Sequence, residues 1–367
     1  SGDAGGTDDA CDGASGAGIL RSLTTGERNA IYRSEAPPLF AAAARAAIAR
    51  SGFEAGDITH VVTASCTGFF APGPDFLLVR DLGIPPTAER THIGFMGCAA
   101  AFPAIRAATH ICDARPGAVV LVVCAELCSL HIRSSRDPEQ IVASAVFGDG
   151  AAAALVSSAE PRAGGPVLEI DGFTTAITAE GEEDMDWTIG DRGFEMRLTA
   201  QVPRIIGREI AGTVAAMLGE GEDPGAGTAV GAGVAAGAVH PGGRSVLDRV
   251  QAGLGLPDAA MAHSRAVLRD YGNMSSATIL FILQRILGDE ATGDGVRVAG
   301  LCFGPGLTVE TALFTRRSVR SAAGGAARLA ADRAARLAAG RAVDIAAGPV
   351  ADIAAISGIG ARSGARA

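Results

Sequence analysis

Lysine is missing from this chain, and aromatic residues and long apolar runs are scarce. All 31 basic residues are arginines, which excludes any chemistry that needs a lysine, such as a Schiff base on a substrate carbonyl. The apolar run at 118–128 is among the longest, yet it is well short of the roughly 20 residues of a membrane-spanning helix. The first residues do not combine a basic with an apolar stretch, as a secretory signal does. We therefore expect no membrane span and a cytoplasmic location.

Disulfide and metal-binding patterns are missing as well. The seven cysteines are an odd number scattered over 367 residues, with no CxxC pair and no cysteine–histidine spacing typical of zinc. We expect reduced cysteines, of which Cys112 and Cys124 pack as small buried hydrophobes. The net charge of −9 disfavours nucleic acid as a partner.

Composition divides the chain into four parts. Residues 1–27 are small, polar and glycine-rich, which predicts a disordered start. Residues 28–160 and 161–316 alternate helical and strand patterns, and each part closes with a glycine turn and a strand, which indicates two related α/β halves. Residues 317–367 are rich in Ala, Gly and Arg with few large apolar side chains, so we expect an extension outside the core.

Apolar periodicity and turn residues predict the main elements. The strongest is a central buried strand at 117–126. A helix is expected to begin near residue 36, with prolines near its start and a glycine after its end. Further helices are expected at 75–83, from near Ala101, at 202–218 and at 275–287, and further strands at 58–66, 150–158, 233–240, 296–303 and 307–314.

Three reactive side chains stand beside tight glycine turns. Cys98 lies in "GFMGCAAAF" before a predicted helix, whose positive N-terminal end can lower a thiol pKa. His240 ends a strand in "AVHPGG", and Asn273 opens a helix in "YGNMSSA". Together they suit acyl-thioester chemistry, in which the histidine keeps the thiol ionised and histidine and asparagine donate to an oxyanion or enolate. Each residue alone also fits a structural role.

These motifs resemble the type III polyketide synthases of bacterial type, the chalcone/stilbene synthase family of the thiolase superfamily. The resemblance implies a thiolase-like α/β fold in which two duplicated βαβαβαββ halves form a five-layered αβαβα core. It also implies a homodimer, acyl-CoA and malonyl-CoA as substrates, and no cofactor or metal. The matching stretches run in family order from about residue 28 to 316: "CTGFFAPGPD", "GFMGCAAAF", "VFGDGAAAALV", "AVHPGGRSVLD", "YGNMSSATILFIL" and "FGPGLTVET".

By this resemblance, Cys98 is the acyl-carrying nucleophile, assisted by His240 and Asn273. The implied enzyme is an acyltransferase that repeatedly condenses malonyl-CoA onto an acyl-CoA starter with loss of carbon dioxide, and then cyclises the chain to a pyrone, a resorcinol or a related aromatic polyketide. Two alternatives stay open: a ketoacyl synthase III-like enzyme that condenses once, and a catalytically silent thiolase-fold partner subunit. The HPGG turn and the GNMSSA stretch favour the polyketide synthase.

The resemblance also assigns the walls of the substrate pocket. Phe147 falls on the first gatekeeper phenylalanine, and Met196 replaces the second, unless Phe194 takes that role from a shifted register. Cys66 and His131 stand where the plant enzymes have threonines. The other substrate contacts that the motifs imply are Ser275, Gly304 and Pro305.

Two further assignments concern the CoA phosphates and the dimer. The family's basic residues before the "RNAIYR" stretch are not recognisable here, and Arg244 beside the HPGG turn is a candidate phosphate contact. Ala71 stands where the plant enzymes have a methionine that reaches into the partner's site, and the Ala71–Pro72 peptide bond is a candidate for the cis form. The glycine-rich stretch at 219–240 is unusual for a segment that has to position His240.

Overall fold

Helices and strands alternate along both halves of the chain. The computed structural model describes residues 23–132, 135–136, 138–159, 161–218, 234–319 and 341–344. The first half contains α1 (Thr25–Ser51), β1 (His60–Ser65), α2 (Pro74–Leu82), β2 (Glu89–Gly94), α3 (Ala101–Ala114), β3 (Val119–Leu127), α4 (Pro138–Val146) and β4 (Asp149–Ser157). The second half contains β5 (Gly165–Ile177), β6 (Met185–Gly190), β7 (Gly193–Leu198), α5 (Val202–Leu218), β8 (Ala236–Val239), α6 (Arg244–Leu254), α7 (Asp258–Tyr271), α8 (Thr278–Gly288), β9 (Arg297–Gly304) and β10 (Thr308–Val319), and is followed by β11 (Arg341–Asp344).

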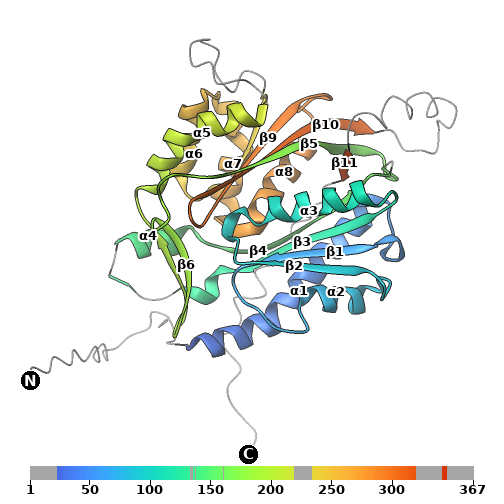
Figure 1. Ribbon diagram of the computed structural model, residues 1–367, viewed down its shortest axis with the longest axis horizontal. Helices are drawn as coiled ribbons and strands as arrows, with labels where there is room; N and C mark the ends of the chain where they lie inside the picture. The colour runs from blue at the N-terminus through green and yellow to red at the C-terminus, as the bar shows by residue number, and fades with distance from the viewer. Residues whose placement is uncertain are drawn as a thin grey trace, which may run out of the picture.

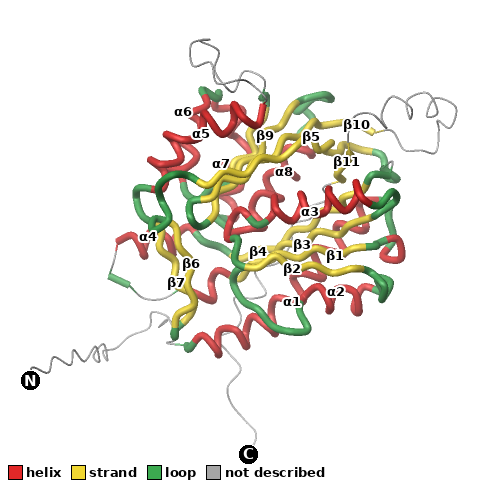
Figure 2. Tube along the Cα trace, viewed as in Figure 1, coloured by secondary structure: helices red, strands yellow, loops and turns green. Residues whose placement is uncertain are grey.

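These elements build five layers (Figures 1 and 2). α1 and α2 cover the outer face of the strands of the first half, and α5, α6 and α7 cover the outer face of the strands of the second half. α3 and α8 lie between the two groups of strands, where their buried side chains form one central core with both. The expected αβαβα arrangement is confirmed.

The layered arrangement explains which residues of each element are buried. All nine residues of β3 are buried because helices cover both faces of its sheet, and this strand is the continuous apolar run that the sequence predicts. Most residues of α8 are buried because the helix is enclosed between two layers of strands. β2 is different: it lies at the edge of the sheet, and five of its six residues are exposed.

Most predicted elements are present with small shifts at their ends. α5 spans 202–218 as predicted, and α3 begins at Ala101. The Ala71–Pro72 peptide bond is cis, and Cys112 and Cys124 are free and buried. The apolar patterns do not reveal β5 or the β6–β7 hairpin, because few residues of these strands are buried and no residue of β6 is fully buried.

Within the described residues, no helix has the length and apolar character needed to cross a membrane.

The first helix begins at Thr25 rather than near residue 36. Thr24 caps it, since the Thr24 N–H donates to the Glu27 carboxylate at 2.8 Å and the Thr24 hydroxyl accepts from the Glu27 N–H at 3.3 Å. Pro37 and Pro38 therefore lie inside the helix, which continues through them because its buried face packs on β3 and β4. The first half thus starts before residue 28, and residues 1–22 lie outside the described part.

The C-terminal extension contributes to the fold. β10 continues to Val319, and β11 pairs antiparallel with both β4 and β5. It joins the two groups of strands into one nine-stranded sheet of order β2-β1-β3-β4-β11-β5-β10-β9-β8. Residues 317–319 and 341–344 therefore belong to the sheet, but Arg317 and Ser318 are exposed, and the expectation that the extension lies outside the core stays a prediction. A four-residue strand within an alanine-rich region has no apolar alternation that could have predicted it.

Candidate active site

The N-terminal ends of two buried helices meet between the halves. Each helix follows one 3-10 turn, Gly97–Ala99 before α3 and Ser275–Ala277 before α8, and the two turns lie against each other. Cys98 belongs to the first turn, and Asn273 just precedes the second. The Sγ atom of Cys98 is 3.8 Å from both Oδ1 and Nδ2 of Asn273. The matching turn and helix in each half support the predicted duplication.

The Asn273 side chain is oriented by its own turn. Its Oδ1 accepts a hydrogen bond from the backbone N–H of Ser275 at 2.9 Å. Because this oxygen is occupied, the Nδ2 amino group is the donor available to the Cys98 sulfur. The first half of the chain holds the turn in place: the Asn273 N–H donates to the carbonyl of Val146, and the Gly148 N–H donates to the carbonyl of Asn273, each at 2.8 Å.

Glycine is required where backbones approach closely around this site. A Cβ atom on Gly148 would lie 2.6 Å from the carbonyl oxygen of Tyr271. A Cβ atom on Gly97, which has a φ of +58°, would lie 2.7 Å from the ring of Pro305. Gly304 packs on the same cysteine turn. Gly304 and Pro305 therefore support the nucleophile, and their contact with substrate stays a prediction.

His240 reaches the site from the end of β8. Its backbone N–H donates to the carbonyl of Leu301 at 2.8 Å, which extends the β8–β9 pairing by one residue. The ring is buried, and neither nitrogen has a hydrogen-bond partner among the described residues. Burial lowers the pKa of His240 to about 3, and the neighbouring Asn273 side chain opposes this shift. Asn273 thus lies next to both Cys98 and His240, and the three predicted catalytic residues share one site.

Burial disfavours the charged form of both reactive groups. Burial raises the pKa of the Cys98 thiol to about 11, although hydrogen bonds from Ser275 and Asn273 oppose the shift. A helix N-terminus predicts the opposite direction. α3 starts only at Ala101, however, and the desolvation of the buried sulfur outweighs the helix dipole. Burial thus favours a neutral thiol and a neutral imidazole in the resting pair, and the ionised thiol that the motif suggests stays a prediction.

A cavity of about 510 Å³ adjoins this site. Ser275, which hydrogen-bonds Cys98, belongs to its wall. Four other predicted substrate contacts also line it, namely Cys66, His131, Phe147 and Met196. Phe194 lines the same cavity, so both candidates for the second gatekeeper face it. The remaining lining residues are Thr67, Cys128, Ile132, Gln140, Ser144 and Trp187.

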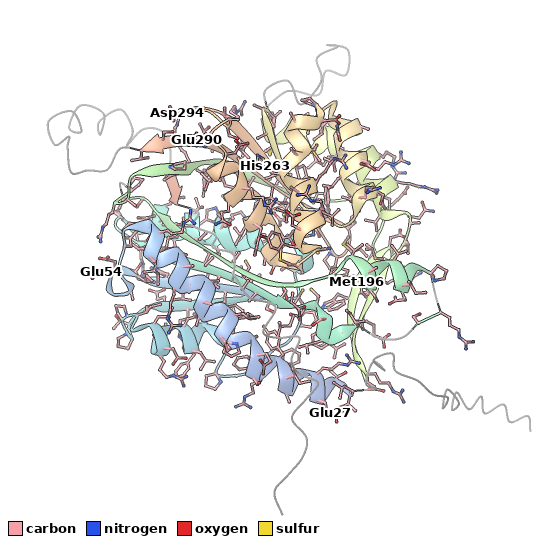
Figure 3. The ribbon with its side chains drawn as sticks, turned by 180° about the vertical axis from the view of Figure 1, so that it is seen from behind. Glu27, Glu54, Met196, His263, Glu290 and Asp294 are labelled. Atoms are coloured by element: carbon pink, nitrogen blue, oxygen red, sulfur yellow. The ribbon has the colours of Figure 1, made fainter. Side chains whose placement is uncertain are left out.

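The β6–β7 hairpin forms one wall of the cavity. Trp187 pairs directly with Met196 across the hairpin, and Phe194 lies two residues before Met196, so the three side chains share one face. Phe194 is only 2% exposed and stacks on His131 with ring centroids 4.3 Å apart. Met196, labelled in Figure 3, is half-buried, and its carbonyl accepts a hydrogen bond from Gln140 of α4 at 2.6 Å. The more accessible Met196 therefore fits an entrance position better.

His131 contributes an aromatic surface rather than a hydrogen bond to the cavity. Its Nδ1 accepts from the Phe194 N–H at 3.0 Å, so Nε2 carries the proton and donates to the carbonyl of Thr67 at 2.7 Å. Both ring nitrogens are thus occupied by backbone groups. Burial lowers the pKa of His131 to about 4, which keeps the ring neutral at neutral pH.

Trp187 and Cys128 are cavity residues that the motifs do not identify. The Trp187 indole N–H donates to the carbonyl of Cys66 at 2.6 Å, which fixes the ring against the wall. The sequence could have indicated Trp187 as a site residue, since it is the chain's single tryptophan and stands in an otherwise polar stretch. The sequence gives no comparable indication for Cys128, because cysteines commonly occur at the ends of buried strands.

Glu126, fully buried at the end of β3, connects the cavity wall to the turn before α8. Its Oε2 accepts hydrogen bonds from the Cys66 N–H at 3.0 Å and the Thr67 hydroxyl at 2.8 Å, and its Oε1 accepts from the Ser276 hydroxyl at 2.5 Å. Burial raises the pKa of Glu126, against these hydrogen bonds. The sequence could have identified Glu126, because it is the single carboxylate inside the apolar run at 118–128 and buried carboxylates are rare.

Arg244 does not line the cavity. It is exposed at the first position of α6, four residues after His240, and borders a separate groove between α6 and α7. Its contact with CoA phosphates stays a prediction.

The layered fold and the cysteine site between its halves are those of a thiolase-like enzyme. Family models agree: residues 18–161 match the N-terminal domain, and residues 169–319 the C-terminal domain, of chalcone and stilbene synthases. The chain belongs to the chalcone and stilbene synthase family, the type III polyketide synthases. Enzymes of this family are acyltransferases that act on CoA thioesters.

Similar proteins come from Oryza, Mycobacterium, Streptomyces and Dictyostelium, and several of them are named polyketide synthases. Bisdemethoxycurcumin synthase of Oryza sativa is 37% identical over 76% of this chain and 70% of its own length. An alpha-pyrone synthesis polyketide synthase-like Pks18 of Mycobacterium tuberculosis is 31% identical over 79% of this chain and 73% of its own length. Among solved structures, 1,3,6,8-tetrahydroxynaphthalene synthase of Streptomyces coelicolor is 28% identical with a TM-score of 0.74, covering 82% of this chain and 83% of its own. The type III polyketide synthase domain of Steely1 from Dictyostelium is 29% identical with a TM-score of 0.75, covering 81% of each chain.

Proposed function

We propose that this chain builds polyketides by repeated decarboxylative condensation of malonyl-CoA onto an acyl starter held as a thioester on Cys98. The observation that carries the proposal is the position of Asn273 beside both Cys98 and His240, next to a cavity whose wall includes Ser275. A nucleophile, a proton acceptor and an amide donor in one buried site satisfy the needs of acyl transfer.

Loading begins with the proton of the Cys98 thiol. As the sulfur attacks the carbonyl of acyl-CoA, the proton moves to the unpartnered imidazole of His240. The bond between the carbonyl carbon and the CoA sulfur then breaks, and the CoA thiolate takes the proton back from His240. The Asn273 amide is placed to donate to the oxyanion that forms between these steps.

Condensation uses the same donors for a second substrate. The bond between the malonyl carboxylate and its methylene carbon breaks, carbon dioxide leaves, and the electron pair becomes an enolate whose oxygen accepts hydrogen bonds from His240 and Asn273. The enolate carbon attacks the Cys98 thioester, and the sulfur leaves as the chain grows by two carbons. The extended chain on CoA reloads onto Cys98 for the next round.

The cavity favours repeated condensation over the single condensation of a ketoacyl synthase III. The cavity lies next to the cysteine site and is bounded by the β6–β7 hairpin, so a growing chain held on Cys98 would lie beside it. Its walls are mainly apolar and aromatic, which suits cyclisation to a pyrone, a resorcinol or a related ring. A silent partner subunit is disfavoured because all three reactive residues are present and grouped.

We also propose a homodimer. β2 is an edge strand with mostly exposed residues, and Phe69 and Phe76 beside it are 51% and 37% exposed. An open strand edge next to exposed aromatic side chains suits pairing with a second copy of the chain.

Mass spectrometry of the products from malonyl-CoA and a series of acyl-CoA starters tests the function. We expect carbon dioxide release and products extended by several two-carbon units, all lost in Cys98→Ala, whereas Cys112→Ala keeps the activity because its thiol packs away from the site. Singly extended ketoacyl products would assign the ketoacyl synthase reaction, and no turnover with any starter would favour the silent subunit.

A further inference from the structure

The chain enters the turn of Cys98 through a phenylalanine in a backbone conformation that phenylalanine rarely adopts. Phe95, three residues before Cys98, has a φ of +57°. Positive φ is common for glycine, but it is unfavourable for any residue with a Cβ atom. Among the described residues, only Phe95 and Ser275 are non-glycine residues with positive φ, and they lie at the two turns that meet in the active site. Such conformations persist where surrounding contacts impose them, and they concentrate at functional sites.

Three phenylalanine rings from separate segments pack together beside this turn. The ring centroid of Phe95 lies 5.4 Å from that of Phe194 in β7 and 6.3 Å from that of Phe69, which follows β1. The centroids of Phe194 and Phe69 are 6.2 Å apart. These are the separations of favourable aromatic pairs. Both partners therefore hold the ring of Phe95 in place.

Phe194 is a fixed support, because it is tied into the cavity wall. It stacks on His131, and its backbone N–H donates to the same imidazole ring. It also meets Trp187 edge-on, with ring centroids 5.8 Å apart. The wall of the cavity thus reaches the cysteine turn through one ring contact, from Phe194 to Phe95.

The end of β9 packs closely on the same turn. A Cβ atom on Gly304 would lie 3.0 Å from the carbonyl oxygen of Met96. Gly97 approaches the ring of Pro305 just as closely. The turn therefore has little room to adjust, and the position of the Cys98 sulfur depends on the φ angle with which the chain enters it.

We propose that Phe95 is a positioning residue for Cys98. Its ring contacts keep the backbone at positive φ, and this conformation places the Cys98 sulfur beside Asn273. Without the ring, a residue with a Cβ atom relaxes toward negative φ and moves the sulfur away from Asn273. The inference rests on the proposed function, because it concerns the nucleophile of that reaction.

Alanine and glycine at position 95 separate this role from simple packing. Both Phe95→Ala and Phe95→Gly remove the ring, but only glycine adopts positive φ at little cost. Acyl loading of Cys98 from an acyl-CoA starter, followed by peptide mass spectrometry, should therefore be about tenfold slower in Phe95→Ala than in Phe95→Gly. Equal loading in the two variants, slower loading in Phe95→Gly, or unchanged loading in Phe95→Ala overturns the proposal.

Phe173 supplies the matched control. It is half-buried in β5, and its φ is not positive. Glycine has no advantage over alanine at such a position, because it loses more conformational entropy on folding. Phe173→Gly should therefore load the starter no faster than Phe173→Ala. A glycine advantage of the same size at both positions would contradict the proposal.

Alkylation of Cys98 examines the same turn without any turnover. Cys98 is only 9% exposed, so burial shields its thiol. Labelling by iodoacetamide should be about tenfold faster in Phe95→Ala, where the relaxed turn exposes the sulfur, and close to that of the unchanged chain in Phe95→Gly. Equal labelling rates in the two variants contradict the positioning role. A lack of acyl loading in the unchanged chain counts against the proposed function alone, because alkylation still reports on the turn.

Discussion

Burial sets the chemistry of Cys98 and His240 at the residue scale. The two groups have pKa values shifted away from each other, to about 11 for the thiol and about 3 for the imidazole. A charged pair is therefore disfavoured until a substrate arrives, and the thiol gives up its proton only as it attacks. Such a site protects its cysteine from reaction with small oxidants and alkylating agents.

The pH dependence of alkylation tests this view. Iodoacetamide reacts with the thiolate, and with a thiol pKa raised to about 11 the thiolate fraction grows tenfold per pH unit below that value. We expect the labelling rate of Cys98, measured by peptide mass spectrometry, to rise steadily from pH 6 to pH 9. Cys98→Ala supplies the background from the other cysteines. A rate that levels off above pH 6 would instead reveal a preformed thiolate–imidazolium pair.

The functional residues differ in how well the sequence alone predicts their position and role. Cys98, His240 and Asn273 carry recognisable glycine motifs, and the structure places them together as the motifs suggest. The role of His131 could not be predicted, because it depends on backbone groups of Thr67 and Phe194 from distant segments. The direction of the Cys98 pKa shift likewise depends on burial, which the local sequence does not report.

The β6–β7 hairpin controls the cavity at the scale of the elements. Trp187→Ala removes an aromatic wall that is fixed to the Cys66 carbonyl, and so enlarges the cavity. We expect a shift toward bulkier starters or longer products, with about a tenfold change in the ratio of two starters, measured by mass spectrometry of competition reactions. Ile189→Ala on the same hairpin is the control, because Ile189 is 50% exposed. An unchanged product profile in Trp187→Ala would show that the hairpin does not bound the growing chain.

The segment before β4 positions Asn273 through close backbone contact. A methyl group at Gly148 would lie 2.6 Å from the Tyr271 carbonyl, so Gly148→Ala should push the two segments apart. We expect a loss of about 2 kcal/mol in the free energy of unfolding, measured with urea, and a large fall in the rate of malonyl-CoA decarboxylation. Gly212→Ala in α5 is the control: a Cβ atom there would have no heavy atom of a neighbouring element within 4 Å, and it should stabilise the helix by about 0.5–1 kcal/mol. Full activity in Gly148→Ala would contradict this role.

Elements differ in predictability for a physical reason. β3 and α5 have strong apolar patterns and are found within two residues of their observed ends. The start of α1 is set by the capping box of Thr24 and Glu27 rather than by the proline pair, so a prediction from prolines alone fails. The exposed β6–β7 hairpin has no buried run to reveal it, although it forms a wall of the site.

At the scale of the whole molecule, the active site depends on how the two halves meet. Cys98 comes from the first half and His240 and Asn273 from the second, and the central layer of α3 and α8 joins them. The motif order predicts this arrangement through the family resemblance. The position of β11 between β4 and β5 could not be predicted, because strand pairing over such a distance leaves no local pattern.

The most direct test is to find where an acyl group becomes attached to the full chain. The protein is incubated with an acyl-CoA starter without malonyl-CoA, quenched in acid and digested, and its peptides are examined by mass spectrometry. The account predicts one acyl thioester on Cys98, absent in Cys98→Ala and formed much more slowly in His240→Gln. An acyl group on another cysteine such as Cys66 or Cys128, or equally fast labelling in His240→Gln, would contradict it.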